Sequence, residues 1–409
     1  MAASPNADLR VLFAARLLRM FAYGMLGVVL VLYLAQLGLT SGQIGLLLTL
    51  TLLGDVAISL WLAAHADRWG RRKTLVAGAA LMAFGGAVMA GTDRFLLLVI
   101  AATIGVISPS GSEVGPFLSV EQACLAQEVS HENRTRLFAW YNVAGYLASA
   151  LGALAVGAGM KFAAGLLGGE LAAYRAVFCA YAAGGAALGG LALLLSRGVE
   201  APADSAAPAR GPTLLGLHES RGFVLRLSAL FALDSFGGGF ILQSFLAWWF
   251  HQKFGATGAA LGWVFFGTNL LSGLSALAAV PLARRIGLVN TMVWTHLPSN
   301  FLLMLVPLMP TLPLAIAALL ARHVLSQMDV PTRQSYVNAV VPARERSAAN
   351  GVTATAKQLG AAIGPVVAGK LFAVAAASAL PFFACGVLKS SYDLMLWRAF
   401  RKTKPPEER

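Results

Sequence analysis

The chain is a succession of long apolar blocks separated by short polar breaks. Most blocks reach roughly 20 residues, which is enough for one helix to cross a hydrocarbon core about 30 Å thick. Only 12% of the 409 residues are charged, well below the usual fraction in a soluble protein, and the mean hydropathy is +0.71. The pattern therefore excludes a soluble globular fold. It also disfavours a membrane β-barrel, whose strands alternate apolar and polar residues over about ten positions.

We expect an all-α membrane protein with twelve transmembrane helices in two pseudo-symmetric six-helix bundles. The domain boundaries that we expect are an N-terminal bundle over 1–196, a cytoplasmic linker over 197–222, and a C-terminal bundle with a cytoplasmic tail over 223–409. The linker is rich in Ala and Pro and has no apolar periodicity, which is typical of a flexible tether. The spans lie near residues 11–36, 43–65, 74–91, 96–127, 137–160, 171–196, 223–250, 257–282, 290–309, 313–341, 348–373 and 376–398.

The span at 96–127 is too long for one straight crossing, and it contains the run SPSGSEVGP. Proline removes a backbone donor and glycine loosens a helix, so we expect a kink or an unwound turn there. Inside a membrane, the freed backbone groups need protein or a water-filled cavity around them. We therefore expect this fourth span to line a cavity.

The net charge of +13 is carried mainly by alternate breaks rather than by one solvated patch, which argues against a nucleic acid partner. By the positive-inside rule these basic breaks face the cytoplasm. We therefore expect a multi-pass protein of the cell inner membrane with both termini cytoplasmic. Outside the C-terminal tail, the basic residues of these breaks are Arg68, Arg71, Arg72, Lys73, Arg134, Arg136, Arg197, Arg210, Arg221, Arg284, Arg285, Arg344 and Arg346.

The two halves repeat at a constant offset of about 212 positions. The offset places Glu121-Gln122 on Arg333-Gln334, and Gly152 on Gly364. Several matches on one offset indicate a duplicated bundle, the arrangement expected when two halves rock about a central site.

The break after the second span reads AAHADRWGRRKT and resembles the signature loop of the major facilitator superfamily. Gly70 permits a tight reversal, and the arginines hold the loop in the cytoplasm. The chain departs from the signature at Ala63 and His65, which stand where the family has glycine and leucine. The residues that match the signature are Asp67, Arg68, Gly70, Arg71 and Arg72.

The resemblance implies a transporter whose two halves alternate access to a central site, and it makes the loop a conformational switch. In the family the residue that matches Asp67 pairs with the N-terminus of the eleventh helix and favours the outward-facing state. The second half keeps a degenerate copy, LARRIGLVNT, without an Asp. The fourth-helix arginine of the family is missing because Ala101 stands four residues before Gly105, so a proton relay that depends on that arginine does not transfer.

Charged side chains inside the spans are few, and each needs a partner or a cavity, since a charge at the bilayer centre costs at least about 2.5 to 3.5 kcal/mol. Apart from Asp55, those that we identify fall on the first, fourth, seventh and tenth spans, among them Arg16, Arg322 and His323. The family resemblance places these four helices around the central pathway. The substrate or coupling residues that we predict are Glu121, Arg333, Asp234, Glu113, Asp329, Arg19, Asp55, Gln122 and Gln334.

Glu121 lies near mid-membrane, and Arg333 holds the equivalent place in the second half. A pair across the pseudo-two-fold axis would form a central gate or substrate site. The alternatives are a permanent structural ion pair, or charges satisfied within each half, for which Asp329, one turn before Arg333, offers a local partner.

Asp234 precedes the glycine run SFGGGF, which indicates a flexible or closely packed segment. Burial favours the neutral form of an acid, so Asp234 or Glu121 can hold a coupling proton; the alternative is a static hydrogen-bonded acid. Asp55 either lines the pathway or supports helix packing.

We expect proton-coupled efflux of a small organic compound or drug, with no enzymatic activity. The alternative is uptake or facilitated transport of a small metabolite, anion or metalloid, with Arg19 and Arg333 as anion clamps. An enzyme is disfavoured because the chain lacks GxxxxGK[ST] and HExxH motifs.

We expect a monomer that contacts a small-molecule substrate and the lipid bilayer, with no cofactor and no bound metal. The proton gradient is the expected driving force. Three cysteines, Cys124, Cys179 and Cys385, lie in apolar stretches and are expected to be buried thiols, the alternative being ligands for a soft metal or metalloid.

Overall fold

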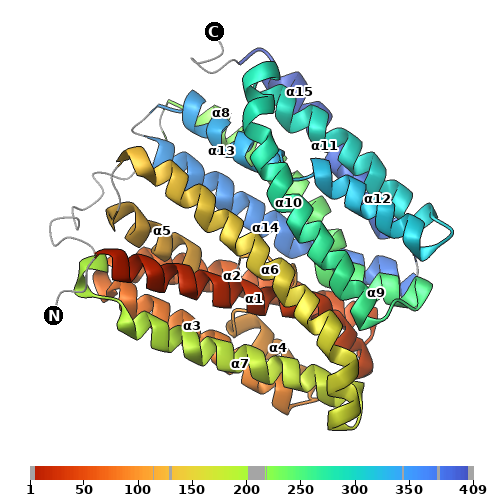
Figure 1. Cartoon of the computed structure of the whole chain (residues 1–409). Coiled ribbons are helices and arrows are strands. Elements are labelled where there is room, and N and C mark those ends of the chain that lie inside the picture. Colours follow the sequence, from red (N-terminus) through yellow and green to blue (C-terminus); the bar gives the residue numbers. More distant parts are fainter. Residues whose placement is uncertain are drawn as a thin grey trace. The chain divides into compact units, whose positions relative to one another are not determined.

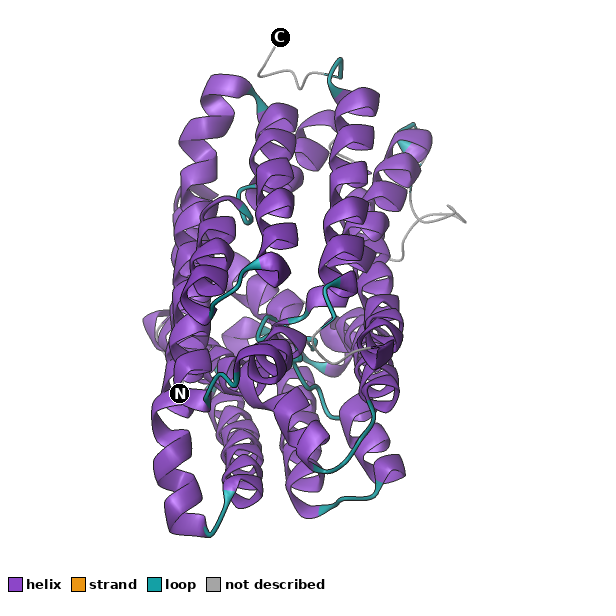
Figure 2. Ribbon diagram, turned by 90° about the vertical axis from the view of Figure 1, so that its right-hand side faces the viewer, coloured by secondary structure: helices purple, strands orange, loops and turns teal. Residues whose placement is uncertain are grey.

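The computed structural model describes residues 5–113, 115–128, 131–200, 217, 219–342, 345–374 and 378–403, and these residues are almost entirely helical (Figure 2). They divide into two compact units. Unit 1 comprises Met1–Pro208, Gln243–His251 and Gly255–Phe266; unit 2 comprises Ala209–Leu242, Gln252–Phe254 and Gly267–Arg409.

The helices follow the predicted order of spans (Figure 1). In unit 1 they are α1 (Pro5–Gln36), α2 (Ser41–Trp69), α3 (Arg71–Gly91), α4 (Phe95–Ile104), α5 (Phe117–Glu128), α6 (His131–Leu167) and α7 (Glu170–Leu194), followed by the short η1 (Arg197–Val199). In unit 2 they are α8 (Arg221–Gly238), η4 (Gly239–Ile241), α11 (Leu288–Leu305), η5 (Val306–Leu308), α12 (Leu312–Leu325), α13 (Asp329–Val340), α14 (Arg346–Val374) and α15 (Leu380–Phe400). Helices α9 (Gln243–Phe254) and α10 (Gly258–Ile286) contribute to both units.

Each predicted span corresponds to one helix or to two successive helices, so the twelve-helix expectation is confirmed. Within the described residues, seven stretches are long and apolar enough to cross a membrane by length and composition alone. They are Ala7–Gln36, Ser41–Ala63, Arg71–Gly91, Trp140–Leu167, Glu170–Leu194, Arg221–Phe254 and Gly258–Ile286. Two of the other spans are interrupted, between α4 and α5 and between α12 and α13.

The predicted break in the fourth span is confirmed, since α4 ends at Ile104 and α5 begins only at Phe117, with no helix among the described residues between them. Gly111 and Gly115 turn the chain there with φ values of 65° and 81°, which favour glycine. Ser149 of α6 donates a hydrogen bond to the Gly111 carbonyl over 2.9 Å, and the Gly115 amide donates to Asp55 of α2 over 2.5 Å. Protein groups therefore satisfy part of the freed backbone. The predicted cavity beside this span stays a prediction.

The seventh span is interrupted at its glycine run, where α8 gives way to the single turn η4. A Cβ on Gly239 would lie 2.6 Å from the Ala361 carbonyl oxygen and 2.8 Å from the Cα of Gly364. The predicted close packing is therefore confirmed, because only glycine lets α14 approach the η4 backbone so closely.

The sequence repeat has a counterpart in the packing of each unit. Helix α1 packs along α6 in unit 1, and α8 packs along α14 in unit 2. At these contacts the repeat-related glycines Gly152 and Gly364 lie against the backbone of Phe21 and of Gly239. Equivalent helices thus meet through equivalent glycines, and the two pseudo-symmetric bundles are confirmed.

Part of the predicted linker, residues 201–216 and 218, lies outside the described residues. The predicted domain boundaries and the flexible tether therefore stay predictions. The cysteine expectation needs one correction: Cys124 and Cys385 are buried free thiols, but Cys179 is exposed on α7. An exposed thiol in an apolar span is consistent with a helix face turned toward lipid.

Candidate functional site: two buried charge networks

The first network lies in unit 1 and centres on Arg19 of α1. Two nitrogens of Arg19 donate to the two carboxylate oxygens of Glu121 over 2.6 and 2.7 Å, and Nε donates to Glu113 over 2.9 Å. Arg19 is 0% exposed and Glu121 is 1% exposed. A two-point contact between guanidinium and carboxylate is the geometry that makes a buried pair stable.

Arg16 and Tyr141 complete this network, which we call the Arg19 network. Arg16 lies one turn before Arg19, pairs with Glu113, and stacks its guanidinium 4.8 Å from the centre of the Tyr141 ring. Tyr141 of α6 donates its hydroxyl hydrogen bond to Glu121. Glu113 belongs to the break between α4 and α5, so the unwound segment places a carboxylate beside two arginines.

The hydrogen bonds of Asp55 do not join it to the Arg19 network. Its carboxylate accepts hydrogen bonds from the Gly115 amide and from the Ser59 hydroxyl on its own helix, over 2.5 and 3.2 Å. These bonds fasten the break to α2, as the helix-packing alternative requires. Gln122 is half-buried and Gln334 is exposed.

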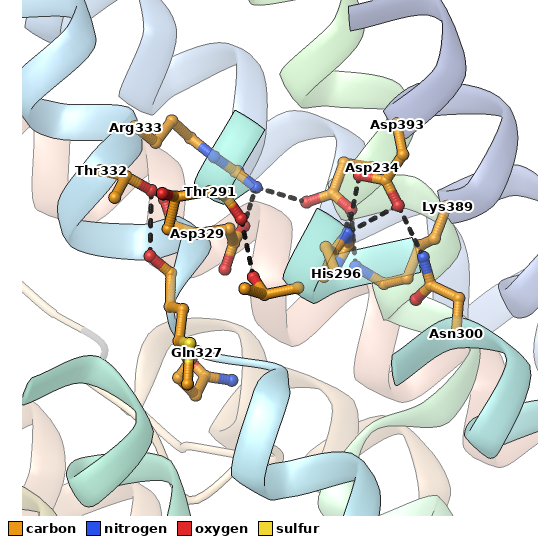
Figure 3. Close-up of polar contacts among 12 residues, drawn as sticks. Asp234, Thr291, His296, Asn300, Gln327, Asp329, Thr332, Arg333, Lys389 and Asp393 are labelled. Carbon is orange, nitrogen blue, oxygen red and sulfur yellow. Dashed lines mark hydrogen bonds and ion pairs between the residues drawn. The ribbon is translucent and has the colours of Figure 1, made fainter. Parts of the chain in front are cut away.

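The second network lies in unit 2, and Asp234 of α8 is at its centre (Figure 3). One oxygen of Asp234 accepts a hydrogen bond from Lys389 of α15 over 2.7 Å, and the other accepts from Arg333 of α13 over 3.1 Å. Arg333 also pairs with Asp329, four residues earlier on α13. Asp234 and Asp329 are 5% and 4% exposed, so water screens these contacts little.

The same network continues through α11, and we call the whole of it the Asp234 network. His296 of α11 contacts Asp393 of α15 through Nδ1 over 2.9 Å, and Asn300 donates to Asp393 over 2.9 Å. His296 and Asn300 are one turn apart on α11, as Lys389 and Asp393 are on α15. Two helices that pack together thus present two pairs of polar side chains to each other.

Sequence reasoning missed His296, Lys389 and Asp393, all of them buried. The expectation that the buried charges beyond Asp55 lie on the first, fourth, seventh and tenth spans is therefore wrong. The sequence did contain a signal, a lysine and an aspartate four residues apart inside one apolar span. Each buried charge is costly unless a partner compensates it, so this spacing indicates a buried polar network.

Comparison with known proteins identifies the family. The family model described as Major Facilitator Superfamily matches residues 12–248 and 227–409. The chain belongs to the major facilitator superfamily. The family resemblance of the signature loop is thereby confirmed.

One protein with a similar sequence is an uncharacterized membrane protein of Saccharomyces cerevisiae, YJR124C. It is 32% identical over 394 residues, which cover 90% of this chain and 88% of the relative. Because this relative is itself uncharacterised, it does not indicate which substrate this chain binds.

Solved structures of transporters from the superfamily share the fold. A D-xylose-proton symporter matches with a TM-score of 0.76 at 14% identity, covering 99% of both chains. A bacterial homologue of the human lysosomal transporter Spinster matches with a TM-score of 0.75 at 15% identity, covering 98% of both chains. The human organic anion transporter MFSD10 matches with a TM-score of 0.65 at 20% identity, covering 96% of this chain and 100% of that one. At these identities the likeness shows the fold alone.

The superfamily signature loop forms the junction of α2 and α3. Gly70 joins the two helices with a φ of 104°, which confirms the predicted tight reversal, and Gly287 has a φ of 86° at the junction of α10 and α11. The Asp67 side chain lies outside the described part of the chain, so its switch role stays a prediction.

A carboxylate that the sequence did not single out caps this junction. The Glu200 carboxylate accepts hydrogen bonds from the backbone amides of Arg71 and Arg72 over 2.6 and 3.4 Å, and so caps the N-terminus of α3. Arg71 is buried and also donates to the Val199 carbonyl, whereas Arg68 is exposed.

The two central charges of the sequence prediction each have partners in their own unit. Glu121 is held by Arg19, and Arg333 by Asp234 and Asp329, which matches the alternative of charges satisfied within each half. Glu121 and Arg333 belong to different units, and the gate between them stays a prediction. Among the described residues, no group of three or more His, Cys, Asp or Glu side chains could hold a metal ion.

Proposed function

We propose that this protein is a secondary active transporter that exports a small organic compound in exchange for protons, by alternating access between its two bundles. Membership of the major facilitator superfamily and the fold of its solved transporters support the transport activity. We propose further that the protein needs no cofactor and that the proton gradient supplies the energy.

The observation that carries the proton coupling is the double contact of Asp234. Its carboxylate holds a lysine from α15 and an arginine from α13 against α8, so a single negative charge links three helices. A proton on this network would cancel that charge and release at least one of the two cations. Binding of a proton would then change which helices are held together, as a coupled carrier requires.

The Arg19 network supports the same mechanism in unit 1. Glu121 and Glu113 link α1 to α5 and to the break that precedes it through buried ion pairs. Removal of one partner from such a pair costs about 3 to 5 kcal/mol, which is large enough to drive a change of conformation.

The alternative of an anion clamp receives less support from these contacts. All three guanidinium nitrogens of Arg19 donate to carboxylates of the protein, and Arg333 is paired with two aspartates. A substrate anion would have to displace a carboxylate that the fold already holds in place. Mixed-sign networks of this kind favour proton exchange over a fixed anion site.

The remaining parts of the proposal follow from the charge pattern of the sequence. We propose a multi-pass location in the cell inner membrane with both termini in the cytoplasm, because the basic breaks lie on one side. The transporter would act as a monomer without enzymatic activity. Its substrate class is a small organic compound, and growth of a deletion strain on an array of toxic compounds selects candidates.

The test uses inside-out membrane vesicles that contain the overexpressed protein. Respiration acidifies the vesicle interior, and a fluorescent weak base reports the pH difference. Addition of an exported compound should dissipate part of the difference within seconds, because each molecule that enters the vesicle exchanges for protons that leave.

The matched control is the Asp234→Asn variant in the same vesicles, which should respond as vesicles without the protein do. A compound that enters the vesicles without any change in the pH difference would contradict proton exchange. A compound that leaves right-side-out cells no faster with the protein than without it would contradict export.

A further inference from the structure

His296 occupies a position between two carboxylates, one on each side of its ring. Its Nδ1 lies 2.9 Å from Oδ1 and 3.1 Å from Oδ2 of Asp393, and its Nε2 lies 3.9 Å from Oδ1 of Asp234 (Figure 3). His296 is 3% exposed and Asp393 is 0% exposed. The imidazole therefore joins the two acidic groups of the Asp234 network inside the bundle.

The protonation state of the ring decides whether both contacts are favourable. A neutral imidazole has one N–H and one lone pair. The short contact with Asp393 assigns the N–H to Nδ1, so the neutral ring directs the Nε2 lone pair toward the Asp234 carboxylate. Only the imidazolium donates from both nitrogens. A proton on Nε2 therefore turns a repulsive contact into an ion pair with Asp234.

Several charged groups near His296 have partners of their own. Asn300 donates to Asp393, and Lys389 and Arg333 both donate to Asp234. On α12, Arg322 contacts His323, and the Tyr392 ring of α15 lies edge-on with its centre 6.2 Å from that of His296. Further charged groups of this interior are Asp329 on α13 and Lys357 on α14.

Among the described residues, Asp393 is in contact with His296 and Asn300, and no Lys or Arg forms an ion pair with it. A fully buried carboxylate without a cationic partner is costly, and an imidazolium at 2.9 Å is the group best placed to compensate it.

We propose that His296 is the residue that binds the coupling proton, between Asp393, which orients the ring, and Asp234, which receives the new N–H. This assignment rests on the proton exchange proposed above and places its site on α11 and α15, outside the four spans that were expected to carry the pathway charges. The step forms one bond, Nε2–H, and breaks none in the protein. Asp234 then accepts from His296 and holds Lys389 or Arg333 less tightly.

The test measures the proton on His296 directly, without substrate. The full-length protein is labelled with ¹⁵N-histidine and placed in lipid nanodiscs, and the spectrum of its six histidines is recorded from pH 5 to pH 8. His296→Gln removes one pair of signals and so assigns His296. We expect that pair to change from one protonated nitrogen to two as the pH falls, and the doubly protonated fraction to decrease at least tenfold at a fixed pH in Asp393→Asn.

A His296 ring that stays neutral, or stays doubly protonated, over the whole range would overturn the assignment. The control Asp93→Asn, which breaks an exposed pair with Arg175 on the other unit, should leave the His296 signals unchanged. The five remaining histidine signals of His296→Gln show whether that variant is folded.

Flux measurements on the purified wild type and variants in proteoliposomes separate this assignment from the proposed function. His296→Gln in proteoliposomes should lose proton-driven flux at least tenfold, and unchanged proton-driven flux would overturn the assignment. If the wild type itself shows no proton-driven flux, the proposed proton exchange fails, whatever the nitrogen signals show.

Discussion

Asp234 makes more ionic contacts than any other acid described in unit 2, and its position explains why two cations are tolerated in an apolar interior. Lys389 and Arg333 approach it from two helices at 2.7 and 3.1 Å. Arg333 further places its guanidinium 4.6 Å from the Phe231 ring centre, a contact that adds to the ion pair. The network therefore links several helices, and in the proposed mechanism it is the place where one proton changes several contacts.

Asp234→Asn should destabilise the protein strongly, because it leaves two buried cations facing a neutral amide. Breaking a buried pair costs about 3 to 5 kcal/mol, and we expect a clearly lower melting temperature of the purified protein in detergent. The matched control is Asp93→Asn, whose partner Arg175 and own side chain are exposed, with an expected cost below about 1 kcal/mol. Equal melting temperatures for the two variants would contradict the account of Asp234.

The sequence predicted part of this chemistry and missed part of it. The Asp329–Arg333 contact follows from a spacing of four residues on one helix, so it was foreseeable as a local ion pair. The contact of His296 with Asp393 joins residues 97 positions apart, and only the packing of α11 on α15 brings them together. A single sequence contains no direct record of which distant helices pack.

The helices of this protein are interrupted where the chain needs polar backbone or close packing. The fourth span unwinds at a Pro- and Gly-rich run that the sequence identified, and the unwound segment carries Glu113 into the Arg19 network. The interruption between α12 and α13 was not predicted, although Pro331 in the first turn of α13 removes a backbone donor there. Proline signals a break, but its exact position depends on the packing of neighbouring helices.

Gly364→Ala should destabilise the contact of α14 with α8 and η4. A Cβ at Gly364 would lie 2.5 Å from the Cα of Gly239 and 2.8 Å from the Phe236 carbonyl oxygen, so the helices would have to separate. Overpacking of this kind costs about 1 to 3 kcal/mol. Thermal unfolding of the variant in detergent measures the loss.

The control for Gly364→Ala is the same substitution at Gly351, on the same helix, where a Cβ meets nothing within 4 Å. That change should raise stability by about 0.5 to 1 kcal/mol, because alanine favours a helix over glycine. A stabilising effect at Gly364 would show that close helix contact is not what requires glycine there.

At the scale of the whole molecule, the proposed orientation in the membrane follows from the charge pattern of the sequence. Lys73 lies in the first turn of α3 and Arg94 lies three residues after its end; both are exposed, and α3 is long enough to cross the hydrocarbon core. In a protein whose exposed Cys179 is first replaced by Ala, Lys73→Cys should react with a membrane-impermeant maleimide only from the cytoplasm.

Arg94→Cys in the same background should react only from the opposite side. Labelling of intact cells and of inside-out vesicles, followed by mass measurement of the protein, shows from which side of the membrane each cysteine reacts. Reaction of Lys73→Cys in intact cells would contradict the proposed cytoplasmic termini, because it would reverse the sidedness of every break.

The central claim is that proton movement and solute movement are one event, joined by the Asp234 network. The direct measurement is solute distribution across liposomes that contain only the purified protein, under an imposed pH difference of one unit. One pH unit holds about 1.4 kcal/mol, so one-for-one exchange should sustain about a tenfold solute gradient. The account predicts that gradient for the wild type and none for His296→Gln. An equal distribution of solute across wild-type liposomes, with the pH difference intact, would contradict it.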